Sequence, residues 1–187
     1  MNKLKYLFFF MIGALALVAC DDDDDDVVID EVWKARNEAV IEEIRKDAAY
    51  TPIMDASRQD SIFYRVLKQG TGTVYPAITS TVEVRYKGWL VDGTVFDSTA
   101  GYDTPEEDDD LTYTFPLLNS SSPTSYYVVE GWGIALQNMK VGDKWEVYIP
   151  WTLGYGTSTQ SGGKVTIPGC STLIFEIELV RIVSQSM

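Results

Sequence analysis

Apolar and charged residues alternate over residues 82–88, and this period of two predicts a β-strand with one face in a core. The strand is expected to run from Thr81 to Leu90, followed by the turn signal Asp92-Gly93 and a second strand. The residues expected to face the core are Val82, Val84, Tyr86 and Gly88. Those expected to face water are Glu83, Arg85 and Lys87.

Other short apolar runs lie between turn residues, and these also predict strands. A single amphipathic helix interrupts them around Trp132 to Met139, and Gly142 is expected to end it. The pattern is typical of an α+β fold in which one antiparallel sheet is crossed by one short helix. The further predicted strands are Ile62 to Leu67, Tyr113 to Phe115, Lys144 to Ile149 and Leu173 to Ile182.

A longer amphipathic helix is predicted ahead of this domain, from Ile29 to about Ala49, with Asp30 as its N-cap. It either docks on its own domain or pairs two copies into a homodimer. Tyr50 to Ser61 is interpreted as a linker, so residues 29–61 precede a domain of residues 62–187. The apolar stripe of the helix comprises Ile29, Trp33, Val40, Ile41, Ile44 and Ala48.

The first residues predict export from the cytoplasm. Two lysines precede an apolar run from Leu7 to Ala19, which is too short to span a bilayer and typical of a signal peptide over residues 1–19. The run ends in Leu17-Val18-Ala19-Cys20, which resembles the lipobox of bacterial lipoproteins. That resemblance implies that the Cys20 thiol carries lipid and attaches the chain to a membrane.

Residues 20–28 are predicted to form an extended tether, because the like charges of Asp21 to Asp26 repel one another. Acidic residues after the lipidated cysteine resemble the surface-export signals of some Gram-negative lipoproteins, and in other groups the inner-membrane retention signal. We expect a lipid-anchored protein of the cell envelope, in the outer membrane and facing either periplasm or surface.

The composition of the chain excludes one class of partner and several catalytic systems. The chain has 15 basic and 28 acidic residues and a formal net charge of −13, so nucleic acid is an unsuitable partner. It has no histidine, which excludes the Ser-His-Asp and Cys-His catalytic systems. Cys170 is the only cysteine besides Cys20 and is expected to be packed in the core. The acidic run Glu106 to Asp110 is either a solvated loop or a cation site, and no metal or cofactor is predicted.

Six sequence blocks resemble the FKBP-type peptidyl-prolyl cis-trans isomerases and occur in the order that this family shows. They cover nearly all of residues 62–182. The blocks are Tyr64 to Gly72, Val82 to Thr99, Val128 to Trp132, Met139 to Lys144, Leu153 to Gly156, and Ile167-Pro168 with Thr172 to Leu179.

The resemblance implies a bent sheet wrapped around the short helix, with an aromatic pocket between them. It implies hydrogen bonds to substrate carbonyls from the Val129 main-chain NH and the Tyr155 hydroxyl, and a hydrogen bond between Asp97 and Tyr86. By position, the family's catalytic residues fall on Tyr86, Phe96, Asp97, Trp132, Tyr155 and Phe175, and further substrate-binding residues on Tyr113, Val128, Val129 and Ile167.

The function implied by the resemblance is isomerisation of X-Pro bonds in exported polypeptides, by non-covalent binding of the twisted imide and without a cofactor. The alternative is a weakly active or inactive FKBP-like binding module on the cell envelope, which would hold polypeptides or a surface partner.

Overall fold

The structure is a computed structural model that describes residues 29–55, 60–99, 112–119, 122–126, 128–161 and 165–184. Outside these ranges lie the predicted signal peptide, the predicted lipidation site Cys20, the predicted tether and the acidic run Glu106 to Asp110.

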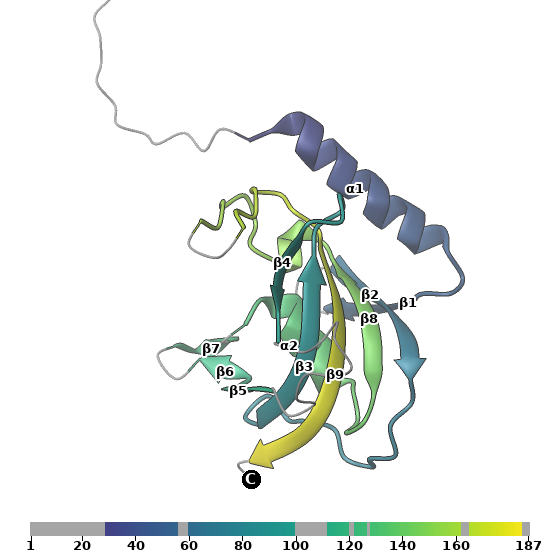
Figure 1. The fold of residues 1–187 in the computed structure, drawn as a ribbon, viewed down its shortest axis with the longest axis vertical. Helices are drawn as coiled ribbons and strands as arrows, with labels where there is room; N and C mark the ends of the chain where they lie inside the picture. Colours follow the sequence, from purple (N-terminus) through teal and green to yellow (C-terminus); the bar gives the residue numbers. More distant parts are fainter. Residues whose placement is uncertain are drawn as a thin grey trace, which may run out of the picture.

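In the described residues, seven strands form one antiparallel sheet that curves around a short helix, α2 (Figure 1). β5 pairs with β3 beside the main strand order β1-β2-β8-β9-β3-β4, and a separate small hairpin is formed by β6 and β7. The strands are β1 Thr51–Asp55, β2 Asp60–Lys68, β3 Thr81–Trp89, β4 Val95–Ser98, β5 Tyr113–Pro116, β6 Leu118–Asn119, β7 Ser122–Tyr126, β8 Lys144–Ile149 and β9 Leu173–Ser184.

The core lies between the inner face of this sheet and α2, Glu130–Gln137. β3 supplies Val82 and Val84, which are fully buried, and α2 supplies Ala135 and Leu136. Cys170 is buried as predicted and is a free thiol. The fold class predicted from the alternation and from the family resemblance is therefore confirmed.

One residue of β3 differs from the expectation. Glu83 was placed on the water-facing side, yet the residue is only 9% exposed. Its carboxylate accepts a hydrogen bond from the Thr112 hydroxyl and pairs with the Arg181 guanidinium. These partners lower the pKa of Glu83, the Thr112 hydrogen bond being the larger cause, and allow a carboxylate to be buried here.

The predicted linker contains a strand. β1 pairs with β2 along its whole length, from Thr51 opposite Tyr64 to Asp55 opposite Asp60. Proline cannot donate a hydrogen bond to a sheet, but β1 is an edge strand with a partner on one side only, where Pro52 is tolerated.

The end of α2 also differs from the prediction. The helix stops at Gln137, where the side-chain Nδ2 of Asn138 donates to the Ile134 carbonyl at 2.9 Å and satisfies an end of the helix. Gly142 lies in the next turn, with a positive φ of 89°.

The N-terminal helix α1 spans Glu31–Lys46 and crosses one end of the sheet (Figure 1). The Asp30 carboxylate accepts from the main-chain N–H of Val32 and Trp33 at 3.0 Å each, which confirms the predicted N-cap. Asn37 and Ile41 are its buried residues, and Trp33 packs against the main core. The helix therefore docks on its own domain. Within the described ranges, neither this helix nor α2 is long and apolar enough to cross a bilayer.

Candidate active site

An aromatic cluster lies where α2 faces β3, β9 and β5, and the Trp132 ring is at its centre. The centroid of this ring is 4.9 Å from that of Tyr86, 5.1 Å from Phe175 and 5.7 Å from Phe115. Phe96 meets Phe175 at 5.4 Å with an interplanar angle of 90°. Edge-to-face contacts of this kind fix the relative orientation of the rings, and Phe96, Trp132 and Phe175 are all buried.

Strand register brings these rings together. Gly88 of β3 lies opposite Phe175 of β9 on one side and Asp97 of β4 on the other. A Cβ atom at Gly88 would lie 2.5 Å from the Cε1 atom of Phe175 and 2.7 Å from the Cζ atom of Phe96. The missing side chain of Gly88 therefore gives the two rings the space in which they meet.

A polar pair lies beside the cluster. The Tyr86 hydroxyl donates to Asp97 Oδ2 at 2.5 Å, which confirms the contact implied by the resemblance. The other oxygen, Oδ1, accepts from the main-chain N–H of Ser98 at 2.9 Å. Both oxygens of the Asp97 carboxylate are thus held in place, and the phenol is held by the carboxylate.

The two phenols near Asp97 stay protonated at neutral pH. Burial and then the Asp97 hydrogen bond raise the pKa of Tyr86. Burial and then the negative charge of Asp97 raise the pKa of Tyr155, a residue that is 40% exposed. The Tyr155 hydroxyl is therefore uncharged and able to donate a hydrogen bond.

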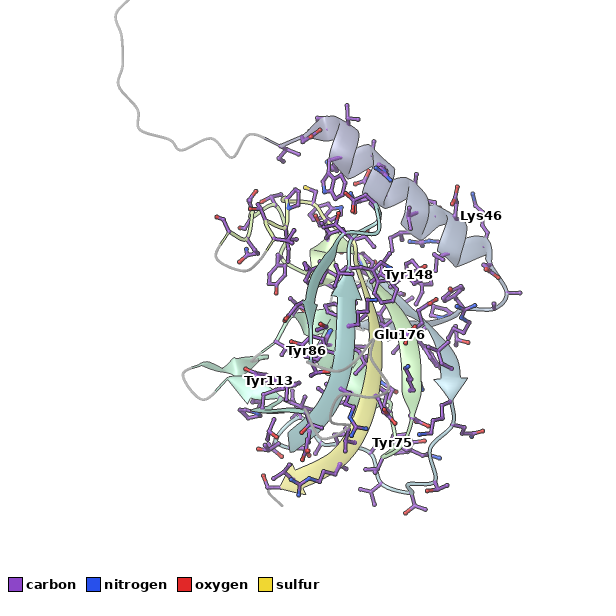
Figure 2. The ribbon with its side chains drawn as sticks, viewed as in Figure 1. Lys46, Tyr75, Tyr86, Tyr113, Tyr148 and Glu176 are labelled. Carbon is purple, nitrogen blue, oxygen red and sulfur yellow. The ribbon has the colours of Figure 1, made fainter. Side chains whose placement is uncertain are left out.

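The remaining predicted site residues lie on β5, in the turn before α2 and in the connection between β8 and β9. Tyr113 is 46% exposed, contacts Phe115, and lies with Tyr86 on the side of the sheet where β4 and β5 run (Figure 2). Val128 and Val129 immediately precede α2 and pack against the core. Ile167 is buried and forms an isolated two-hydrogen-bond bridge with Gln160, at 2.9 Å in each direction.

Three features of the cluster were not identified from the sequence. Phe115 was predicted only as a strand residue, although its position two residues after Tyr113 places both on one face. The space at Gly88 has no sequence signal of its own. The indole Nε1 of Trp132 is buried and has no hydrogen-bond partner in the described part of the chain, so a donor remains available inside the cluster.

No three histidine, cysteine or carboxylate side chains gather into a metal-binding group among the described residues. The loop for which a cation was considered, Glu106 to Asp110, lies outside them.

A bent antiparallel sheet around a short helix, with an aromatic cluster and a Tyr-Asp pair beside it, defines an FKBP-type domain. The sequence profile of the family described as FKBP-type peptidyl-prolyl cis-trans isomerase matches residues 72–180, more than half of the chain. The chain belongs to this family.

Among its relatives, the chain is 41% identical over 126 residues to the FKBP-type 22 kDa peptidyl-prolyl cis-trans isomerase of Escherichia coli, covering 67% of this chain and 52% of that protein. It is 38% identical over 119 residues to the outer membrane protein MIP of Legionella longbeachae, covering 64% and 43% of the two chains. This chain thus spans about half the length of the curated relatives that it matches.

Two solved structures share the fold. A peptidyl-prolyl cis-trans isomerase from Pseudomonas syringae superimposes with a TM-score of 0.62 and 28% identity, covering 82% of this chain and 96% of that one. FkpA from Escherichia coli gives a TM-score of 0.60 and 30% identity, covering 81% and 60% of the two chains.

Proposed function

We propose that this chain is a peptidyl-prolyl cis-trans isomerase that acts on X-Pro bonds of exported polypeptides. The observation that carries the proposal is the cluster of Tyr86, Trp132 and Phe175 beside the Tyr86–Asp97 pair, in a chain of the isomerase family. Tyr86, Phe96, Trp132 and Phe175, all carried over from the family, are linked by ring contacts, and Asp97 is hydrogen-bonded to Tyr86.

The reaction requires no nucleophile. Rotation about an amide C–N bond is opposed by a barrier of about 18 to 20 kcal/mol, because resonance keeps the amide planar. Twisting the bond removes the negative charge that resonance places on the carbonyl oxygen. Removing water from the carbonyl therefore costs less hydration free energy in the twisted state than in the planar one. A dry aromatic site thus stabilises the transition state relative to the substrate.

Each residue has a role in this scheme. Trp132 is the floor on which the proline ring rests, and Phe96 and Phe175 are walls. The Tyr155 hydroxyl and the main-chain NH of Val129 donate to substrate carbonyls. Asp97 orients the Tyr86 phenol by the 2.5 Å hydrogen bond and faces the rotating imide.

Turnover of short X-Pro peptides, followed by a protease-coupled assay or by NMR exchange, tests the proposal. We expect Trp132→Ala to reduce kcat/KM to background, and Tyr155→Phe to lower it by about two- to tenfold, as for one lost hydrogen bond. Tyr75→Phe is the matched control: this phenol is 48% exposed under the Lys140 ammonium, well separated from Tyr86 (Figure 2).

Peptide binding without any rate enhancement in the unaltered protein would contradict the proposal and support the alternative, an FKBP-like binding module. An activity that persists at full strength in Trp132→Ala would exclude the aromatic cluster as the site.

We also propose that the chain is anchored in the cell envelope through lipid on Cys20, where exported polypeptides are available as substrates. The sequence around Cys20 supports this, as does the name of the Legionella relative, an outer membrane protein. Metabolic labelling with a radioactive fatty acid should mark the wild type and not Cys20→Ala. Protease treatment of intact cells separates a surface position, in which the protein is cleaved, from a periplasmic one.

The alternative for α1, pairing of two copies into a homodimer, is tested by sedimentation of the mature chain with and without residues 21–50. A mass of two chains that falls to one on truncation would support it. A single-chain mass in both cases would end it, and α1 would then serve only its own domain.

A further inference from the structure

The connection between β8 and β9 carries two of the proposed site residues, Tyr155 and Ile167. Main-chain hydrogen bonds hold it in shape: Gly156 donates to the Trp151 carbonyl at 2.9 Å, and Cys170 donates to the Gly156 carbonyl at 2.8 Å. We call the described residues of this connection, 151–161 and 165–172, the site loop. Because its own bonds link Tyr155 to the end of the loop, whatever fixes that end also fixes Tyr155.

Helix α1 contacts the end of the site loop through Trp33. The indole Nε1 of Trp33 donates to the Ser171 hydroxyl at 2.9 Å, and this hydroxyl donates in turn to the Pro168 carbonyl at 2.6 Å. Pro168 follows Ile167 directly. Ser171 is 4% exposed, so both hydrogen bonds are sheltered from water. A chain of two hydrogen bonds therefore runs from α1 to the residue beside Ile167.

Asn37 makes a second set of contacts one helical turn further on. Its Oδ1 atom accepts from the main-chain N–H of Thr172 at 2.7 Å, and its main-chain carbonyl accepts from the Thr172 hydroxyl at 3.3 Å. Its Nδ2 atom donates to the Trp33 carbonyl at 2.8 Å. Asn37 and Thr172 are both fully buried, and a buried amide is stable only when paired in this way.

Helix α1 also contacts the start of the site loop. The Lys34 ammonium lies 5.8 Å from the centre of the Trp151 ring, within range of a cation–π interaction. The helix thus contacts the site loop at both ends, through Trp151 on one side and through Ser171 and Thr172 on the other. It does so from outside residues 72–180, the part matched by the family profile.

We propose that Trp33 and Asn37 are positioning residues for prolyl isomerisation: α1 holds the site loop so that Tyr155 and Ile167 stand at the substrate. The proposal rests on the proposed function, because it takes this site to be the one that binds X-Pro. Trp33 also packs against the main core, but the described hydrogen bonds from Trp33 and from the Asn37 side chain to other elements all end on the site loop, at Ser171 and Thr172.

The test compares Trp33→Phe and Ser171→Ala with the wild type in the full chain. Trp33→Phe keeps an aromatic ring but removes the N–H together with part of the indole, whereas Ser171→Ala removes only the hydroxyl that links α1 to Pro168. We expect each variant to raise KM about three- to tenfold, the size of one or two hydrogen bonds, with kcat unchanged within about twofold because the aromatic cluster stays in place. Val32→Ala is the matched control, since Val32 is the neighbouring residue and is 83% exposed.

A double variant shows whether both residues act through one route. If Trp33 acts through Ser171, Trp33→Phe with Ser171→Ala should raise KM no further than the more severe single variant does. Fully additive effects would contradict that route and overturn the proposal for Trp33.

Amide hydrogen exchange supplies a readout that does not depend on turnover. In Trp33→Phe and Ser171→Ala, the amides of Gly156, Ile167 and Cys170 should exchange faster, while those of β8 and β9 keep their wild-type rates. Faster loop exchange with an unchanged KM would mean that α1 only stabilises the loop, and it would overturn the proposal. A raised KM with unchanged loop exchange would also overturn the proposal.

Failure of the proposed function gives a different result. A wild type that shows no turnover would overturn isomerase activity itself. The positioning role would then be judged by NMR titration with an X-Pro peptide: weaker binding in Trp33→Phe together with faster loop exchange supports it, and unchanged binding overturns it.

Discussion

Gly88 is the residue that lets Phe96 and Phe175 meet edge to face. In Gly88→Ala the new methyl group would overlap both rings, and one or both must move. We expect a loss of about 1 to 3 kcal/mol in the free energy of unfolding, the usual result of overpacking, and a clear loss of kcat/KM on X-Pro peptides. Urea unfolding and the peptide assay measure the two effects.

Gly93→Ala is the control for that substitution. Gly93 has a positive φ of 88° and nothing within 4 Å of an added Cβ, so alanine there strains the turn without touching a ring. It should lower stability by about 1 kcal/mol and leave activity intact. Equal activity loss in both variants would show that Gly88 matters for stability only.

The Tyr86 phenol makes the protein sensitive to alkali. The pKa of Tyr86 is raised by burial and by the Asp97 hydrogen bond, so above its ordinary pKa of about 10 the unfolded chain releases a proton that the folded protein keeps. The stability from this group is complete below about pH 10 and is lost as pH rises through the folded pKa. Urea unfolding between about pH 9 and pH 11 should show a shallower decline in Tyr86→Phe than in the wild type.

In Tyr86→Phe the free energy of unfolding should still decline somewhat with pH. The reason is that the pKa values of Tyr50, Tyr148 and Tyr155 are raised as well, burial being the largest cause for each. An identical slope in Tyr86→Phe and the wild type would contradict the assigned hydrogen bond.

At the same scale, a contact between two side chains was predicted where the family resemblance supplied it. The Tyr86–Asp97 contact followed from the family resemblance and is present. Glu83 was misplaced because alternation describes the side of a strand on which a residue lies, and not the partners that allow it to be buried. Those partners, Thr112 and Arg181, are distant in sequence, and no local pattern indicates them.

Among the elements, α1 lies outside the part of the chain matched by the family profile, and its contribution to the stability of the domain can be measured. Ile41 is 6% exposed, whereas Val32 on the same helix is 83% exposed. We expect Ile41→Ala to lower the free energy of unfolding by about 2 to 5 kcal/mol and Val32→Ala to change it by less than about 0.5 kcal/mol. Thermal or urea unfolding of both variants checks this, and equally small effects would mean that α1 contributes little to the folded domain.

Elements with a strong period were predicted well, and those without one were missed. The segments from Lys144 to Ile149 and around α1 have clear alternation or a helical stripe with a cap, and both were identified. β7, Ser122–Tyr126, consists mostly of serine, proline and threonine and shows no apolar alternation. The position of β8 between β2 and β9 could not be read from any segment, because strand order is set by contacts distant in sequence.

The whole molecule is strongly acidic, with a formal net charge of −13. Its field should attract basic polypeptides and repel acidic ones. At low ionic strength, kcat/KM should therefore be higher for a peptide with lysine next to the X-Pro bond than for the matched glutamate peptide. The difference should shrink at about 1 M salt, where the Debye length falls to about 3 Å. A preference that is independent of salt would point to a direct contact in the site.

The sheet ends in β1, an edge strand that contains proline. An open edge is the place where an extended polypeptide can add itself as a further strand, and proline offers no N–H for such pairing. A protein that handles unfolded chains meets many segments able to extend a sheet in this way. If the chain acts on exported polypeptides as proposed, Pro52 would oppose the addition of such a segment to this edge.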